Sequence, residues 1–111
     1  MSERYCFALD LIDNEASIAE YEEHHRNIWP EVVDSFHRAG IVNVELYRTG
    51  NRLMMMLETN EQFSFEKKKA IDEADAVVQK WEKLMSGYQK PLPWSQGEKW
   101  VLMKPIYKLN K

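Results

Sequence analysis

The stretch IVNVELYRTGNRLMMMLE, residues 41–58, decides the fold, because it is typical of two strands joined by a tight turn. The first strand is expected over 41–47 and the second over 53–58, with the polar, glycine-containing segment 48–52 as the turn. The run of residues 53–57 is apolar on both faces of its strand. We therefore expect this strand to be covered on both sides, by a helix on one side and by another layer, such as a second subunit, on the other.

Two helical segments precede the hairpin. Residues 18, 21, 25 and 28 follow one another at steps of three, four and three, which is one face of a helix that starts near residue 15 after an Asp or Asn cap. This face carries Tyr21 and His25 inward. Pro30 disfavours helical geometry at the residue before it and suits a first helical turn, which predicts a second helix over 30–39 that Gly40 ends. The side chains expected to be buried on it are Val32, Val33 and Phe36.

Two further helical segments follow the hairpin. We expect Asn60 to cap a helix that runs to about residue 71, with a break over 72–75. Beyond the break, apolar residues recur at helical spacing, and this pattern turns Trp81 inward. The lysine triplet 67–69 is typical of a solvated helix face.

The two ends of the chain indicate the first and the final strand. Residues 4–11 alternate with the period of a half-buried strand, and residues 100–104 are typical of a final strand. The proline-containing segment 89–99 is expected to be a loop that folds over a site. Strand, helix, hairpin, helix and strand in this order form the split βαβ arrangement. We therefore predict an α+β, ferredoxin-like βαββαβ fold, in which one antiparallel sheet carries its helices on one face, in a single domain over residues 1–111.

The composition excludes several classes of protein. A net charge of −3 and a pI near 5.6 give no positive surface for nucleic acid. No run of about 18 apolar residues predicts a membrane helix, and the first residues lack the pattern of a signal peptide, so we expect a cytoplasmic protein. Cys6, the single cysteine, cannot form an intrachain disulfide and is expected to be a buried, unreactive thiol. The many large aromatic and methionine side chains indicate a homodimer.

Tyr21 and His25 are the candidate catalytic pair. They are i, i+4 neighbours on a helix, so their polar ends can reach one small ligand, and histidine exchanges protons near neutrality because its unperturbed pKa is about 6.5. A core histidine bonded to a backbone carbonyl, with Tyr21 packed beside it, explains the same spacing. His24 falls on another side of the helix and is expected to be exposed. Glu20 and His24 make only a weak metal pair, so we predict no metal site.

The chain contains no motif for phosphoryl, hydride or acyl transfer. Its four tryptophans indicate a monosaccharide ligand instead, because the apolar face of a pyranose stacks on an indole ring. Trp81 and Trp94 are the candidates for this contact, although each tryptophan alone also fits a core position.

Three groups of residues occur in one order along the chain: Tyr21-x-x-x-His25-x-x-Ile28-Trp29-Pro30-Glu31, then Gly40, Asn43 and Tyr47, then Gln79-x-Trp81-x-x-x-Met85. Together they resemble the L-rhamnose mutarotase family over nearly the whole chain. The resemblance implies a dimeric α+β barrel that interconverts the α and β anomers of a 6-deoxyhexose, L-rhamnose or L-fucose, without a metal or cofactor. It also implies that His25 is the catalytic histidine, that Tyr21 acts with it and binds substrate, and that Trp81 contacts the sugar.

Two positions depart from the family pattern. Val44 stands where a tyrosine is usual and Glu82 where a second tryptophan is usual, and both positions belong to the sugar pocket in the family. The ending from residue 91 to residue 100, which includes Trp94, resembles a branch associated with L-fucose. We therefore expect a mutarotase-type isomerase with Trp81, Glu82, Val44 and Trp94 among its substrate-binding residues. The competing hypothesis is a ferredoxin-like dimeric monooxygenase or a small-ligand binding module without catalysis.

Overall fold

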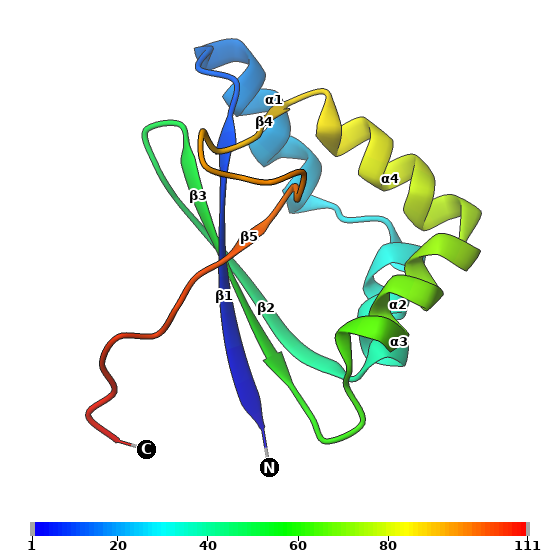
Figure 1. Cartoon of the computed structure of the whole chain (residues 1–111). Helices are drawn as coiled ribbons and strands as arrows, with labels where there is room; N and C mark the ends of the chain where they lie inside the picture. Colours follow the sequence, from blue (N-terminus) through cyan, green and yellow to red (C-terminus); the bar gives the residue numbers. More distant parts are fainter. Residues whose placement is uncertain (1, 111) are drawn as a thin grey trace.

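The hairpin of residues 41–59 pairs with the N-terminal strand to form the centre of an antiparallel sheet (Figure 1). The structure is a computed structural model that describes residues 2–110, and over these residues the strand order is β2-β3-β1-β4, with β5 also paired with β1. This is the order of the ferredoxin-like fold, which confirms the predicted fold class. The strands are β1 (Glu3–Leu11), β2 (Ile41–Thr49), β3 (Arg52–Thr59), β4 (Gln89–Lys90) and β5 (Val101–Leu102).

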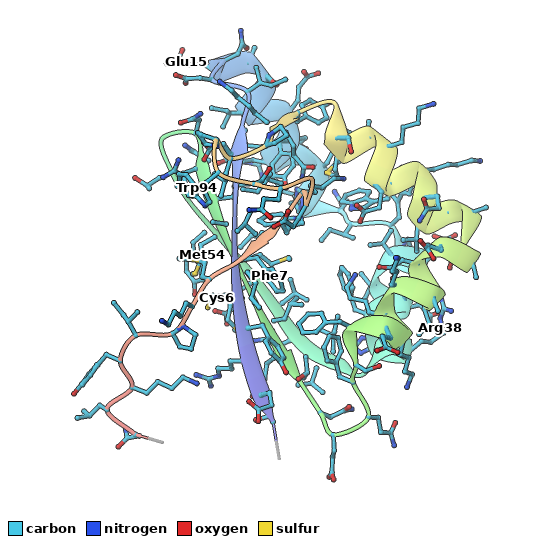
Figure 2. The ribbon with its side chains drawn as sticks, viewed as in Figure 1. Cys6, Phe7, Glu15, Arg38, Met54 and Trp94 are labelled. Atoms are coloured by element: carbon cyan, nitrogen blue, oxygen red, sulfur yellow. The ribbon has the colours of Figure 1, made fainter. Side chains whose placement is uncertain are left out.

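The alternation in β1 separates the two faces of the sheet. Leu9 and Leu11 are fully buried on the side of the helices, and Leu9 lies opposite Leu53 of β3. We call the other side the open face, and it carries Cys6 and Met54; Figure 2 shows these two residues on the side of β1 away from the helices. Cys6, expected to be buried, is only half-buried there.

The helices of the described chain lie together on one side of the sheet (Figure 1). Asn14 caps the first helix, since its side chain accepts a hydrogen bond from the backbone of Ser17, and Pro30 begins the second as predicted. Gly40 ends the second helix at a φ of +90°, where an added Cβ would lie 2.6 Å from the side chain of Asn60. The helices are α1 (Glu15–Arg26), α2 (Pro30–Ala39), α3 (Phe65–Ala74) and α4 (Ala76–Ser86).

The predicted start of α3 is wrong by several residues. Asn60 does not cap this helix, because its side chain accepts from the backbone N–H of Gln62 and so closes a local turn. Ser64 provides the cap instead, by accepting from the backbone N–H of Lys67. The N–H of Asn60 donates to the carbonyl of Gly40, which fixes this turn against the end of α2.

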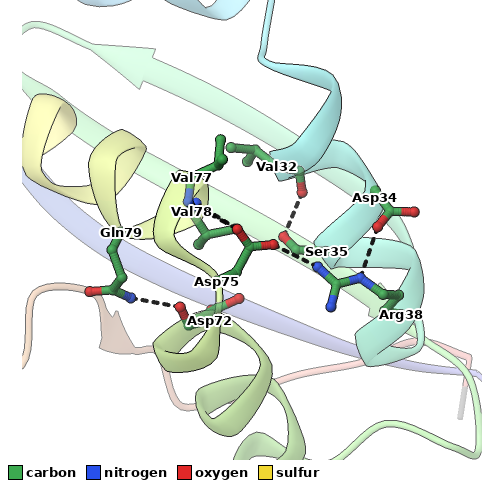
Figure 3. Close-up of polar contacts among 9 residues, drawn as sticks. All are labelled: Val32, Asp34, Ser35, Arg38, Asp72, Asp75, Val77, Val78 and Gln79. Atoms are coloured by element: carbon green, nitrogen blue, oxygen red, sulfur yellow. Dashed lines mark hydrogen bonds and ion pairs between the residues drawn. The ribbon is translucent and has the colours of Figure 1, made fainter.

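Asp75 joins three helices at the expected break, as Figure 3 shows. Its carboxylate accepts from the backbone N–H groups of Val77 and Val78 and thereby caps α4. The same carboxylate accepts from Arg38 of α2, which also pairs with Asp34. Helix α4, and with it Trp81, is therefore positioned from α2. No helix among residues 2–110 is long and apolar enough to cross a membrane.

Three other predictions about packing need correction. Val33 is 37% exposed, and Ser35 takes its place on the buried side of α2 because its hydroxyl donates to the carbonyl of Val32. The segment 89–99 is not wholly a loop, since its first two residues form β4. The final strand is also shorter than expected, because only two residues of it pair with β1.

Candidate active site

A cavity of about 310 Å³ lies between the helix side of the sheet and the helices. Its walls combine apolar side chains of the hairpin with aromatic and polar side chains of α1 and α4, which suits a small ligand that has both apolar and polar parts. The lining residues are Tyr21, His25, Ile28, Phe36, Val44, Leu46, Met55, Leu57, Lys68, Trp81, Glu82, Met85, Gln89 and Trp100.

Tyr21 and His25 face this cavity from adjacent turns of α1. Their ring centres lie 4.5 Å apart, and His25 Nδ1 lies 2.8 Å from the backbone carbonyl of Tyr21. A carbonyl only accepts hydrogen bonds, so Nδ1 carries the proton and donates it. In the neutral ring, Nε2 is then the basic nitrogen, and it has no hydrogen-bond partner among the described residues.

Burial sets the protonation of both groups. Burial lowers the pKa of His25 from its ordinary value of 6.5. The hydrogen bond to the Tyr21 carbonyl raises this pKa in part, and the neighbouring His24 lowers it further. Burial also raises the pKa of Tyr21 to about 12, although the hydrogen bond from Gln89 opposes this shift. At neutral pH the pair therefore consists of a neutral imidazole base beside a protonated phenol donor.

Trp81 forms the aromatic wall behind this pair. It is only 6% exposed, and its ring packs edge-on against His25 at 5.5 Å and against Trp29 at 5.3 Å between ring centres. Tyr21, Leu11 and Trp81 belong to one buried cluster, so the wall of the cavity is also part of the protein core. This location agrees with both readings of Trp81, as core residue and as cavity residue.

The two positions that depart from the family pattern also reach the cavity. Val44 lines it from β2, and Glu82 lines it from α4. The carboxylate of Glu82 pairs with Lys99 at 3.1 Å, which ties the C-terminal segment to α4. The site therefore has a small apolar wall at one position and a paired carboxylate at the other.

Trp94 is the candidate that the structure does not bring to the cavity. It is 59% exposed and lies over the guanidinium of Arg52, which pairs with Asp10 on the open face. The expectation for His24 is wrong, since His24 is half-buried and its Nε2 lies 3.2 Å from the hydroxyl of Tyr88. Across residues 2–110, no three His, Cys, Asp or Glu side chains are grouped to hold a metal ion.

Several residues of the cavity were not predicted from the sequence, among them Gln89, Trp100 and Lys68. Gln89 and Trp100 come from the C-terminal segment, whose path over the sheet depends on pairing with β1 and leaves no local signal. Lys68 belongs to the triplet interpreted as a solvated face, and it is the one of the three that lines the cavity. Lys68 pairs with Asp72 one turn later in α3, and this pairing does not indicate its inward direction, so the sequence held no signal for it.

The structure defines a small α+β protein of the ferredoxin-like fold, with a histidine and a tyrosine beside an aromatic wall in a cavity between sheet and helices. The family model of L-rhamnose mutarotase matches residues 4–109, and the chain belongs to this family. An L-fucose mutarotase of Xanthomonas campestris is 44% identical over 112 residues, covering 98% of this chain and 90% of that protein. The resemblance found in the sequence, including its L-fucose branch, is thereby confirmed.

Two solved structures support the fold. The crystal structure of an L-rhamnose mutarotase from Formosa agariphila superposes with a TM-score of 0.71 at 16% identity, covering 97% of this chain and 99% of that one. A dimeric ferredoxin-like protein from an uncultured marine organism gives a TM-score of 0.56 at 9% identity, covering 96% and 91% of the two chains. At these identities the two comparisons concern the fold alone.

Proposed function

We propose that this protein interconverts the α and β anomers of a 6-deoxyhexose. L-fucose is the preferred substrate, and L-rhamnose is a poorer one. The observation that carries the proposal is the pair of Tyr21 and His25, a protonated donor and a neutral base side by side in the cavity. Ring opening moves a proton from the anomeric hydroxyl to the ring oxygen, so anomer exchange needs a group that takes and returns a proton, and a neighbouring donor can hold the anomeric oxygen in place.

His25 carries this proton in the proposed mechanism. Nε2 takes the proton of the anomeric hydroxyl while the bond between C1 and the ring oxygen breaks and C1 becomes an aldehyde. The imidazolium then gives the proton to the ring oxygen, so charge is balanced in the open-chain sugar. Rotation about the C1–C2 bond and the reverse transfers close the ring to the other anomer. Tyr21 keeps its proton throughout and donates a hydrogen bond to the anomeric oxygen as that oxygen becomes a carbonyl.

The sugar preference rests on the walls of the cavity. Val44 leaves more room beside β2 than a tyrosine does, and the carboxylate of Glu82 offers an acceptor where an indole is usual. Since hydrogen-bonding groups that line a pocket discriminate between hydroxyl patterns, the change favours a sugar other than L-rhamnose. The 44% identity to an L-fucose mutarotase points to L-fucose.

A panel of sugars tests this function. Exchange between anomers is measured by saturation-transfer NMR with L-fucose, L-rhamnose and D-glucose at equal concentrations. We expect the largest acceleration for L-fucose, a smaller one for L-rhamnose and little for D-glucose. Equal acceleration of all three sugars would show that the cavity is not tuned to a 6-deoxyhexose.

The pH dependence of exchange is expected to follow His25. Because its pKa is lowered, kcat/KM rises with pH through a midpoint below 6.5 and stays level at neutral pH, where the imidazole is neutral. Tyr21, with a pKa of about 12, causes no fall in rate in the neutral range. The measurement is the NMR exchange rate between about pH 5 and pH 9, corrected for the uncatalysed rate. A midpoint above 6.5, or a fall through neutrality, contradicts the assignment of His25 as the base.

The protein is also proposed to act as a homodimer of one-domain subunits, each comprising residues 1–111. The open face carries the half-buried Cys6, Met54 and Met56, and the C-terminal residues Ile106 and Leu109 are 91% and 80% exposed. Apolar side chains left on one face of a sheet favour a second layer.

Met54→Lys is therefore expected to convert the dimer to a monomer, because the substitution places a charge on this face, whereas Met54→Leu keeps the dimer. Light scattering after size exclusion measures both masses. A monomeric wild type, or a Met54→Lys variant with the mass of the dimer, contradicts this proposal.

A further inference from the structure

Gln89 presents an unused acceptor at the cavity. It lies on β4, opposite Leu11 of β1, and its side chain lines both the main cavity and a second hollow of about 200 Å³ under the segment from Pro91 to Lys99. Its Nε2 donates to the hydroxyl of Tyr21 at 3.3 Å. Its Oε1 is buried and has no hydrogen-bond partner among the described residues.

A buried amide oxygen without a partner is unfavourable, and native proteins leave few such atoms. Gln89 itself lines the cavity, so a ligand bound there is the natural partner for this oxygen. An amide oxygen only accepts, so the ligand must supply a donor, such as a hydroxyl group.

The same amide also orients Tyr21. The bond from Gln89 Nε2 occupies one lone pair of the phenol oxygen, which leaves the phenol proton to point to the ligand. In the proposed mechanism that proton goes to the anomeric oxygen on C1. Because Oε1 belongs to the amide that contacts Tyr21, we assign it to the hydroxyl next to C1, which is the one on C2.

We infer that Gln89 is a specificity-determining residue whose Oε1 accepts a hydrogen bond from the 2-hydroxyl of the sugar while its Nε2 orients Tyr21. The inference rests on the proposed function for its choice of ligand. It also gives a reason for selectivity, because L-fucose and L-rhamnose have opposite configurations at C2. A fixed acceptor in a buried wall satisfies one of these configurations better than the other.

Gln89→Met tests the inference, because methionine has nearly the length of glutamine but neither amide group. Titration calorimetry gives the affinities of wild type and variant for L-fucose and for 2-deoxy-L-fucose. We expect the variant to bind L-fucose roughly 10- to 100-fold more weakly and 2-deoxy-L-fucose nearly as well as wild type, since only the first sugar loses a bond. Gln62→Met is the matched control: Gln62 is exposed and outside the cavity, so both affinities stay unchanged.

Anomer exchange of the same samples separates the two proposals. The role of Gln89 is overturned if a folded Gln89→Met variant loses equal affinity for both sugars or loses none for either. Normal anomer exchange by the wild type would then still support the proposed function. Selective loss of L-fucose binding without any exchange in wild type supports Gln89 and overturns the function. Wild type that neither binds nor exchanges L-fucose or L-rhamnose overturns both. If Gln89→Met does not fold, Gln89→Asn, which withdraws the same amide from the cavity, is measured in its place against the same outcomes.

Discussion

His25→Asn is expected to slow catalysed anomer exchange by roughly 10²- to 10⁴-fold, the usual contribution of one general acid or base. Asparagine retains an N–H that can donate to the carbonyl of Tyr21, as Nδ1 of His25 does at 2.8 Å, so the local fold of α1 is preserved. The variant loses Nε2, the nitrogen that takes and returns the proton in the proposed mechanism. Saturation-transfer NMR on L-fucose measures the exchange rate, and circular dichroism confirms that the variant is folded.

His24→Asn is the matched control for this substitution. His24 directly precedes His25 in the sequence and contacts Tyr88, but it does not line the cavity. Replacing His24 removes a small effect that lowers the pKa of His25, so the midpoint of the pH profile moves slightly to higher pH. The exchange rate at neutral pH stays within a few-fold of the wild-type rate. Retention of more than a tenth of the wild-type rate by folded His25→Asn would remove His25 from the mechanism.

Trp81→Ala is expected to lower the free energy of unfolding by about 3–5 kcal/mol, the range for truncating a buried aromatic ring. Trp81 is 6% exposed and contacts Trp29 and His25, so its removal leaves a hole that connects with the cavity. Urea denaturation followed by circular dichroism measures the loss. Trp81→Phe keeps a ring at the site and is expected to lose less than half as much.

Sugar binding separates the two readings of Trp81. If the indole contacts the sugar as well as the core, Trp81→Phe weakens L-fucose binding although the protein remains folded. A loss of stability below about 1 kcal/mol in Trp81→Ala would contradict the packing described for this residue, because surface substitutions fall in that range.

Local rules were sufficient for much of the fold and for placing the proposed catalytic pair. Tyr21 and His25 were placed together by the i, i+4 spacing of a helix, and Pro30 and Gly40 marked the bounds of α2 through their backbone preferences. The two faces of the first strand follow from the alternation of buried residues such as Leu9. Each of these features is determined within a few residues of sequence, which is why the sequence predicts them.

The remaining features depend on distant contacts. Asn60 and Ser64 are both good caps, and the hydrogen bond between Asn60 and Gly40 decides between them. Gln89 reaches the cavity because β4 pairs with the end of β1. Trp94 lies outside the cavity because its ring packs against Arg52. Sequence periodicity contains no information about such pairings, so these residues were missed or misplaced.

The exchange of L-fucose anomers by the unmodified protein tests the central claim most directly. One anomeric proton is saturated and the transfer of saturation to the other anomer is measured as protein is added, with a heat-denatured aliquot as the blank. We predict that the exchange rate rises in proportion to the concentration of folded protein, well above the rate in buffer. A rate equal to the blank at every concentration, with L-rhamnose as well as L-fucose, would contradict the claim, and sugar binding without exchange would make the protein a binding module.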